Sequence, residues 1–237
     1  MPPSVCAASL AHNRLLALLL SIARERLLPY LEAVPLLVGN ELYQVGQKIR
    51  YVYFPTHGLV SLVHVVGQGE AQVATVGCEG VIGLAALMDC EHARIHPIVQ
   101  IAGSAYRLPS SVLKAELYQN SELQRVFLRY FHTLLMQIAQ IALCNRYHSI
   151  EQQLCRCLLL STQHSFQQPL MLTQEQIAKL LGVRREGVTL AAGRLQQLSV
   201  IRYHRGCIEI LDRAKLERLA CECYGTLKNK APQEGAL

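Results

Sequence analysis

Residues 172–210 read LTQEQIAKLLGVRREGVTLAAGRLQQLSVIRYHRGCIEI, and this stretch decides the fold of the C-terminal part of the chain. Thr173 is followed three residues later by Gln176, which is a capping box: each side chain satisfies a backbone N–H at the start of a helix. Apolar residues at helical spacing then predict a helix over about 174–181. Gly182 ends that helix, because glycine readily takes the left-handed conformation that turns a chain out of a helix.

A second helix is predicted over about 184–197, and a small hairpin follows it. The apolar positions of this helix recur every three or four residues: Val188, Ala191, Ala192, Leu195 and Leu198. Its first turn is charged and comprises Arg184, Arg185 and Glu186. Two short β-prone runs, 200–203 and 207–210, then surround a His204-Arg205-Gly206 turn. Two helices joined by a tight glycine turn and followed by a basic hairpin describe a winged helix-turn-helix.

The charged first turn of the second helix suits double-stranded DNA. The tip of a recognition helix enters the major groove, where arginine bonds to guanine and glutamate accepts from cytosine. Free N–H groups at a helix N-terminus also favour phosphate. The alternative is that Arg184 and Arg185 form an ordinary solvated face. The order of cap, glycine turn, basic helix and wing favours base reading over that alternative.

Residues 172–201 resemble the C-terminal DNA-binding domain of the Crp/Fnr regulators, bacterial homodimers with an N-terminal cyclic-nucleotide-binding-like barrel. The resemblance places the base-contacting roles on Arg185 and Glu186. The family usually has a further basic residue four positions after Glu186, where this chain has Leu190, so a different half-site sequence is expected. The resemblance also implies RNA polymerase as a partner.

The remaining DNA contacts are expected to be made to phosphates. The candidates are Arg184, Thr173, Thr189, Arg194, Arg202, His204 and Arg205. Two recognition helices in a homodimer would lie about 34 Å apart, one turn of DNA, which predicts a near-palindromic site. An effector-gated sensor (haem, metal, redox or nucleotide) with conditional DNA binding is the alternative function.

Composition sets limits on the class of protein. The net charge is +6, and residues 148–237 carry +4 of it, as a phosphate-binding module should. Nine cysteines, an odd number, in a chain this long indicate a reducing cytoplasm. The apolar run at 15–23 is too short to span a bilayer and predicts an amphipathic or buried helix, with no membrane association. Paired carboxylates, a nucleophile elbow and a P-loop are all missing, so no catalytic residues and no enzyme activity are expected.

The N-terminal part predicts an α+β fold. A helical segment from Asn13 to Leu31, interrupted by Pro29, precedes short β-rich runs separated by glycines. Those predicted strands cover 48–54, 59–66, 72–76, 98–102 and 105–108. This spacing favours an antiparallel sandwich or barrel, and the resemblance makes it a β-roll, a cupin-like double-stranded barrel with flanking helices.

Residues 77–83 resemble the glycine-rich phosphate cassette of the same family, with Gly80, Gly83 and Arg94 as candidate ligand contacts. In cyclic-nucleotide binders, the cassette carries a glutamate, and an arginine followed by serine or threonine holds the phosphate. Here Leu84 replaces the glutamate and Ile95 follows the arginine. A degenerate pocket is therefore expected, with no bound cofactor.

The spacing of the cysteines and histidines along the sequence matches few metal-binding patterns. Only Cys6 lies near the N-terminus, so an iron–sulfur cluster there is not expected. The Cys155-x-Cys157 and Cys221-x-Cys223 pairs are predicted to lie in helices, where residues two apart point to different sides. Both pairs are interpreted as packing residues. Cys90, His92 and His96 could hold a metal or haem, but their loose spacing favours a surface loop. No metal site is predicted.

A long helix is predicted over 116–147, with Leu123, Phe127 and Tyr130 at helical spacing and further apolar residues on its other faces. Such a helix must be buried on more than one side, either in a dimer with a second copy or within a single-chain core. Residues 145–149 are the candidate hinge. The predicted organisation is a sensor domain at 1–115, a dimerisation helix and hinge at 116–147, a winged helix-turn-helix at 148–225 and a tail at 226–237.

Overall fold

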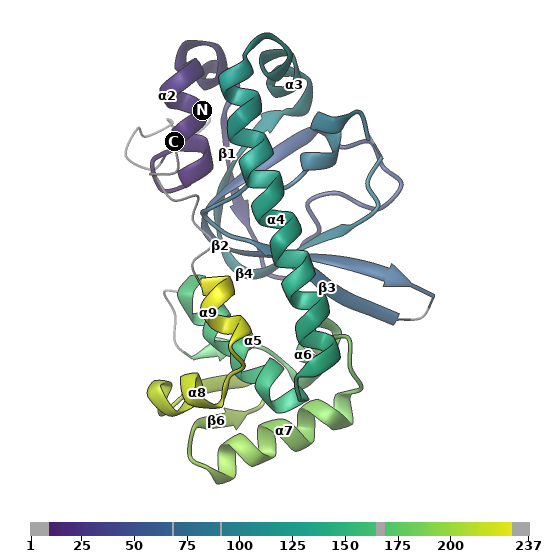
Figure 1. Cartoon of the computed structure of the whole chain (residues 1–237), viewed down its shortest axis with the longest axis vertical. Helices are drawn as coiled ribbons and strands as arrows, with labels where there is room; N and C mark the ends of the chain where they lie inside the picture. Colours follow the sequence, from purple (N-terminus) through teal and green to yellow (C-terminus); the bar gives the residue numbers. More distant parts are fainter. Residues whose placement is uncertain (1–9, 68, 91, 165–168, 229–237) are drawn as a thin grey trace. The chain divides into compact units, whose positions relative to one another are not determined.

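The computed structural model describes residues 10–228, apart from residues 68, 91 and 165–168 (Figure 1). The chain divides into two compact units. Within the described part, the first unit comprises residues 10–62 and 75–135, and the second comprises residues 63–74 and 136–228. Most of the predicted tail at 226–237 lies outside the described residues.

Helix α2 (Arg14–Leu27) starts the first unit and is held by Asn13. The Asn13 carboxamide is fully buried; its oxygen caps the helix by accepting from the N–H of Leu16 at 2.8 Å. Its nitrogen donates to the carbonyls of Pro55 and Gly80 at 2.9 and 2.8 Å. The leucines of α2 lie in the core of this unit, which confirms the predicted buried helix. A short 3₁₀ turn, η1 (Leu28–Tyr30), follows where Pro29 interrupts the helix.

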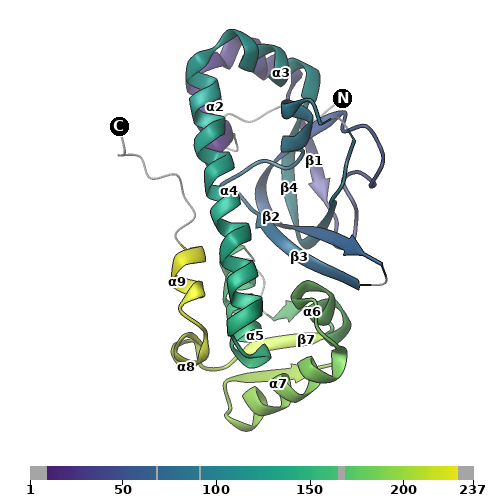
Figure 2. The ribbon, with the colours of Figure 1, turned by 45° about the vertical axis from the view of Figure 1, so that its right-hand side comes forward.

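The N-terminal sheet has the hydrogen-bonded strand order β1-β4-β2-β3, and Figure 2 shows it as a rolled sheet. Its strands are β1 (Glu32–Leu36), β2 (Tyr51–Val66), β3 (Gly69–Val76) and β4 (His96–Pro109). β1 pairs antiparallel with β4. A 3₁₀ helix, η2 (Leu84–Met88), follows the glycine-rich segment. The expected α+β β-roll is confirmed.

Strands β2 and β4 are longer than predicted, because two glycines interpreted as strand breaks lie inside them. A Cβ at Gly103 would stand 2.2 Å from the carbonyl oxygen of His57. A Cβ at Gly58, where φ is +86°, would stand 2.5 Å from the carbonyl oxygen of Ile101. The two backbones therefore approach so closely that only glycine fits at either position. The prediction of four separate strands here was wrong; there are two.

Two helices replace the single predicted helix over 116–147. α3 (Ser110–Gln119) ends before Asn120, and α4 runs from Ser121 to Tyr147. The Asn120 side chain accepts from the N–H groups of Glu122 and Leu123 at 2.9 and 3.2 Å, which caps the new helix. Leu123, Phe127 and Tyr130 lie in the core, as their spacing predicted.

Another face of α4 stays uncovered in the single chain. Its exposed large side chains are Leu128, Phe131, Leu135, Met136, Leu143 and Tyr147. α4 is also long and apolar enough to cross a membrane, although core helices of soluble proteins meet the same test. A helix covered on one face only leaves the other face available to a partner.

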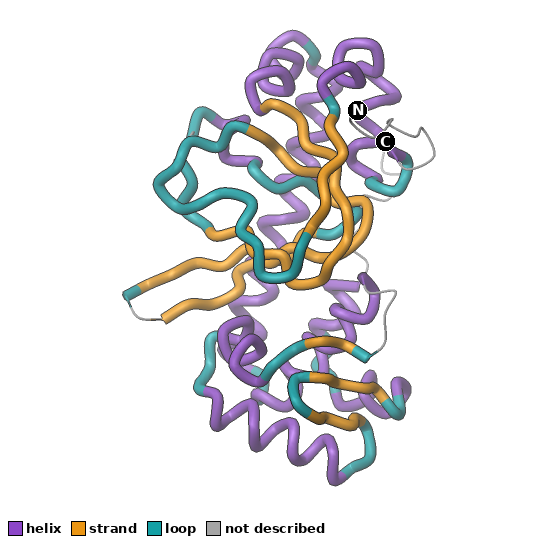
Figure 3. The backbone as a smooth tube through the Cα atoms, turned by 180° about the vertical axis from the view of Figure 1, so that it is seen from behind, coloured by secondary structure: helices purple, strands orange, loops and turns teal. Residues whose placement is uncertain are grey.

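The second unit is a helical domain with a three-stranded sheet of order β5-β7-β6. After the end of α4 come α5 (Ile150–His164), β5 (Leu170–Met171), α6 (Gln174–Leu181), α7 (Arg185–Gln197), β6 (Ile201–His204), β7 (Cys207–Ile210), α8 (Arg213–Leu219) and α9 (Cys223–Lys228). Figure 3 shows the three strands among the helices. One apolar core joins α5, α6, α7 and the sheet. β5 and α9 were not predicted, and α9 extends beyond the predicted boundary at residue 225.

Candidate nucleic-acid interface

The first helix of the motif, α6, is capped at both ends by the residues that predicted it. The Thr173 hydroxyl accepts from the N–H of Gln176 at 3.2 Å, and the Gln176 side chain accepts from the N–H of Thr173 at 2.8 Å. Gly182 forms the C-cap with φ at +65°. The predicted capping box and glycine turn are both confirmed, and they fix where α7 can begin.

The second helix, α7, presents a charged, unobstructed N-terminus. Arg184 is its N-cap residue in an extended conformation, and no side chain caps the first turn. Val188, Ala191, Ala192 and Leu195 face the core. Arg184, Arg185 and Glu186 are exposed, and in the described part of the chain none of them has an ion-pair partner. The free N–H groups, the helix dipole and two guanidinium groups therefore point outward together.

The wing is a two-stranded hairpin whose turn lies beside the start of α6 (Figure 2). β6 and β7 pair antiparallel from Ile201–Ile210 to His204–Cys207. Arg205 and Gly206 both have positive φ, at +47° and +79°, which is the conformation that two-residue hairpin turns require. A Cβ at Gly206 would lie 3.1 Å from the Thr173 methyl carbon. The basic turn and the first residue of the motif are therefore neighbours.

All nine residues predicted to contact DNA are exposed: Thr173, Arg184, Arg185, Glu186, Thr189, Arg194, Arg202, His204 and Arg205. Two of the arginines have carboxylate partners, because Arg194 pairs with Glu151 at 3.2 Å and Arg202 with Glu209 at 2.7 Å. Surface pairs of this kind contribute only about 0–1 kcal/mol. Either arginine can therefore exchange its partner for a phosphate with little change in free energy.

One side chain on this surface was undervalued by sequence reasoning. Leu190 lies one turn after Glu186 on α7 and is 76% exposed. In the sequence it stands out only as a departure from the family pattern. An exposed leucine on the charged side of a helix presents apolar surface that no packing explains, and its i+4 spacing from Glu186 was the available signal.

The comparisons with known proteins identify this part of the chain. Residues 152–219 match the family model of the Crp-like helix-turn-helix domain. This region is a Crp-like helix-turn-helix domain. No curated protein sequence matches the chain significantly.

Solved structures extend the likeness from the Crp-like domain to most of the chain. A Crp/Fnr-family regulator from Eubacterium rectale is 16% identical, with a TM-score of 0.70 over 83% of this chain and 93% of the other. FixK2 from Bradyrhizobium japonicum is 17% identical, with a TM-score of 0.67 over 81% and 98%. TTHA1359, a CRP/FNR-family regulator from Thermus thermophilus, is 22% identical, with a TM-score of 0.65 over 80% and 98%. The chain therefore has the fold of the Crp/Fnr transcription regulators, with a cyclic-nucleotide-binding-like N-terminal domain.

The three candidate ligand contacts N-terminal to the Crp-like domain have different surroundings. A Cβ at Gly80 would lie 2.4 Å from the hydroxyl of Tyr130, so the space beside this glycine is filled. That hydroxyl accepts from the N–H of Val81 at 3.1 Å and donates to its carbonyl at 3.0 Å. Gly83, with φ at +95°, packs against the Tyr51 carbonyl, and Arg94 is exposed. Burial raises the pKa of the Tyr130 phenol, which keeps it a neutral donor.

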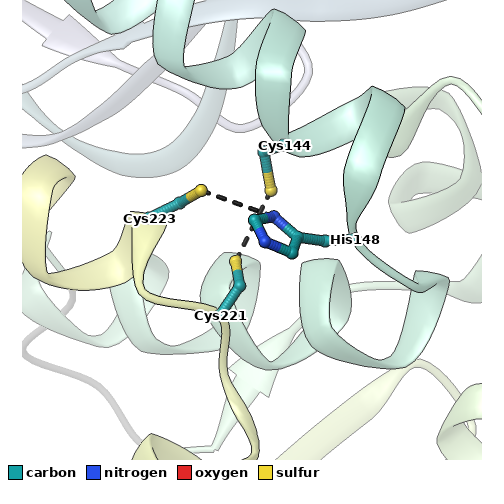
Figure 4. A group of neighbouring side chains, drawn as sticks. All are labelled: Cys144, His148, Cys221 and Cys223. Carbon is teal, nitrogen blue, oxygen red and sulfur yellow. Dashed lines mark hydrogen bonds between the residues drawn. The ribbon is translucent and has the colours of Figure 1, made fainter.

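The second unit brings together Cys221 and Cys223, which were interpreted as packing residues, with two residues from the end of α4. Cys155 and Cys157 are indeed buried in the core of α5. Cys221, however, lies between α8 and α9 rather than in a helix, and it meets Cys144, His148 and Cys223 (Figure 4). These residues lie far apart in the sequence, so spacing could not reveal them. The looser group at 90–96 does not form such a cluster: His96 instead lies 3.1 Å from the Glu41 carboxylate.

Proposed function

We propose that the protein is a cytoplasmic transcription regulator that binds a near-palindromic DNA site as a homodimer, with RNA polymerase as a further partner. The observation that carries this proposal is the uncapped, outward-facing N-terminus of α7 with Arg184, Arg185 and Glu186 exposed together. Arg185 and Glu186 read bases, and the exposed Leu190 contacts a thymine methyl group on the same helix face. The wing and Thr173 contact phosphates.

The uncovered face of α4 supports the homodimer. Leu128, Phe131, Leu135, Ile138 and Ala142 follow the alternating three- and four-residue spacing of a coiled-coil seam. Leu128, Phe131 and Leu135 are 66%, 39% and 50% exposed in the single chain. A parallel pairing of two such helices covers this face and gives two recognition helices related by two-fold symmetry. Symmetry of that kind predicts an inverted-repeat operator.

The second candidate is an effector-gated regulator, favoured by a surface cavity of about 410 Å³ in the first unit. Its lining is mainly apolar and includes Leu84, Leu87, Met88, Phe127 and Phe131. A small apolar effector could enter it. Measuring DNA affinity with and without cyclic nucleotide, reductant and chelator separates the two candidates, because tight binding by the untreated protein removes the need for an effector.

The decisive experiment is selection of bound sequences from a random DNA pool, followed by substitution of Arg185. We expect an inverted repeat with half-sites one helical turn apart. Arg185→Ala should then weaken binding to the selected site by about 1–3 kcal/mol and relax the preference at one base per half-site. Binding to random DNA should fall much less. An equal loss on selected and random DNA would show that Arg185 contributes only charge.

A further inference from the structure

Four metal-binding side chains converge in the second unit on the break between α4 and α5. Cys144 lies in the last turn of α4, and His148 follows its end with the helical i, i+4 spacing that places both on one face. Cys221 and Cys223 come from the segment between α8 and α9 and from the start of α9. The sulfur and nitrogen atoms all lie within 4.8 Å of one another (Figure 4).

The distances fit the edges of a tetrahedron around a single ion. With Zn–S near 2.3 Å and Zn–N near 2.0–2.1 Å, tetrahedral angles put two sulfurs about 3.8 Å apart and a sulfur and a nitrogen about 3.5 Å apart. The sulfurs of Cys144 and Cys221 are 3.5 Å apart, and the sulfur of Cys223 is 3.5 Å from Nδ1 of His148. An iron–sulfur cluster spreads its ligands over several irons and needs wider spacing.

A donor from outside the cluster contacts one of its sulfurs. Nε2 of Gln140 donates to the sulfur of Cys223 at 3.0 Å. Cysteine binds a metal as the thiolate, and a hydrogen bond donated to the sulfur stabilises that form.

A buried guanidinium near the cluster has two nitrogens without an acceptor in the described part of the chain. Arg156 is only 5% exposed, and its Nε and Nη1 have no hydrogen-bond acceptor among the described residues. Buried charges are expected to be paired. Zn²⁺ with three thiolates and a neutral imidazole carries one negative charge, which compensates the guanidinium of Arg156.

The histidine also has the outer partner that metal-bound histidines usually have. With Nδ1 directed at the cluster, its Nε2 lies 3.1 Å from the carboxylate of Glu222. A carboxylate in this position fixes the tautomer and the ring orientation and makes the histidine a better ligand. Glu222 lies between two of the cysteines in the sequence, so one short segment supplies both ligands and support.

We propose that Cys144, His148, Cys221 and Cys223 bind one Zn²⁺ as a closed structural site. Three sulfurs and one nitrogen in a tetrahedral arrangement select zinc over calcium and magnesium, which prefer oxygen. Four protein ligands leave no open position for substrate, so the ion joins the end of α4 to the segment that begins α9. The site goes beyond DNA recognition, and its occupancy does not depend on DNA.

The test is the metal content of the full-length protein purified under reducing conditions without chelator. We expect one zinc per chain, and after exchange with Co²⁺ we expect the visible bands of tetrahedral cobalt together with thiolate charge-transfer absorption. Cys221→Ser should lose both. Cys90→Ser removes an exposed cysteine outside the cluster and should keep both.

A second variant separates a loss of zinc binding from a loss of folding. Glu222 is largely exposed, with 82% of its side chain accessible, so Glu222→Gln should fold normally. This substitution should weaken zinc binding about 10–100-fold in a chelator competition, because only the carboxylate that orients His148 is lost and all four metal ligands remain. Wild-type protein with no bound metal, no cobalt bands and every thiol titratable would overturn the proposal, and so would a Cys144–Cys221 disulfide. A failure of DNA binding alone would leave these results unchanged.

Discussion

Neutralising the wing arginine should reduce the salt dependence of DNA binding without changing its sequence preference. Arg205 lies at the exposed turn of the β6–β7 hairpin with no carboxylate partner in the described part of the chain. If it binds a phosphate, Arg205→Gln removes one such interaction from each protomer and two from a dimer. Each phosphate interaction that the substitution removes reduces the slope of log K against log salt by about 0.9.

The expected change in slope is therefore about 1.8 for a dimer. Raising the salt fourfold, from about 50 to about 200 mM, should then narrow the affinity gap between wild type and Arg205→Gln by about 12-fold. The ratio of specific to random binding should stay the same. Fluorescence anisotropy with the selected operator and a scrambled duplex at several salt concentrations measures both quantities.

Arg218→Gln is the matched control, because it removes the same charge from an exposed position on α8 that is not among the predicted DNA contacts. Its slope should equal that of wild type. Two results would refute the reasoning. An unchanged slope for Arg205→Gln would mean that the wing does not contact the DNA backbone. A several-fold shift in the ratio of specific to random binding would mean that Arg205 reads a base.

Two further substitutions test the core contact and the dimer. Tyr130→Phe removes the hydroxyl that pairs both backbone groups of buried Val81, so the free energy of unfolding measured in urea should fall by about 2–4 kcal/mol. The control Tyr118→Phe, at an exposed tyrosine, should lower it by under about 1 kcal/mol. Equal losses for the two variants would contradict the role of the Tyr130 hydroxyl in the core. Leu135→Glu places a carboxylate in the proposed seam. Sedimentation at micromolar concentration should show a monomer, because about 2 kcal/mol of apolar burial per copy is lost and a buried charge is added. Arg129→Glu, off the seam on the same helix, should stay dimeric, and a dimeric Leu135→Glu would exclude this face.

The C-terminal motif could be predicted because its signals are local. Thr173, Gln176 and Gly182 determine a helix and its turn through contacts within ten residues, and the structure reproduces them. The helix α8 is likewise determined locally, because Asp212 caps it by accepting from the N–H of Lys215 at 2.8 Å. Interactions between residues this close in the sequence form without contributions from distant segments.

The errors occurred where distant segments decide the structure. Gly58 and Gly103 were interpreted as breaks because glycine is common in turns, yet each is required by the other strand's backbone. The exception is the single predicted helix over 116–147, which is divided by a local contact: the Asn120 side chain caps α4 by accepting from the N–H of Glu122 at 2.9 Å. Cys144 and Cys221 meet across 77 residues, a proximity that no local spacing encodes.

The phenol of Tyr130 has a consequence for any small molecule that approaches the glycine-rich segment of the first unit. It occupies the space next to Gly80 and is bonded to both backbone groups of Val81. A molecule entering this space would first have to displace the tyrosine, which would leave the buried N–H and carbonyl of Val81 without their partner.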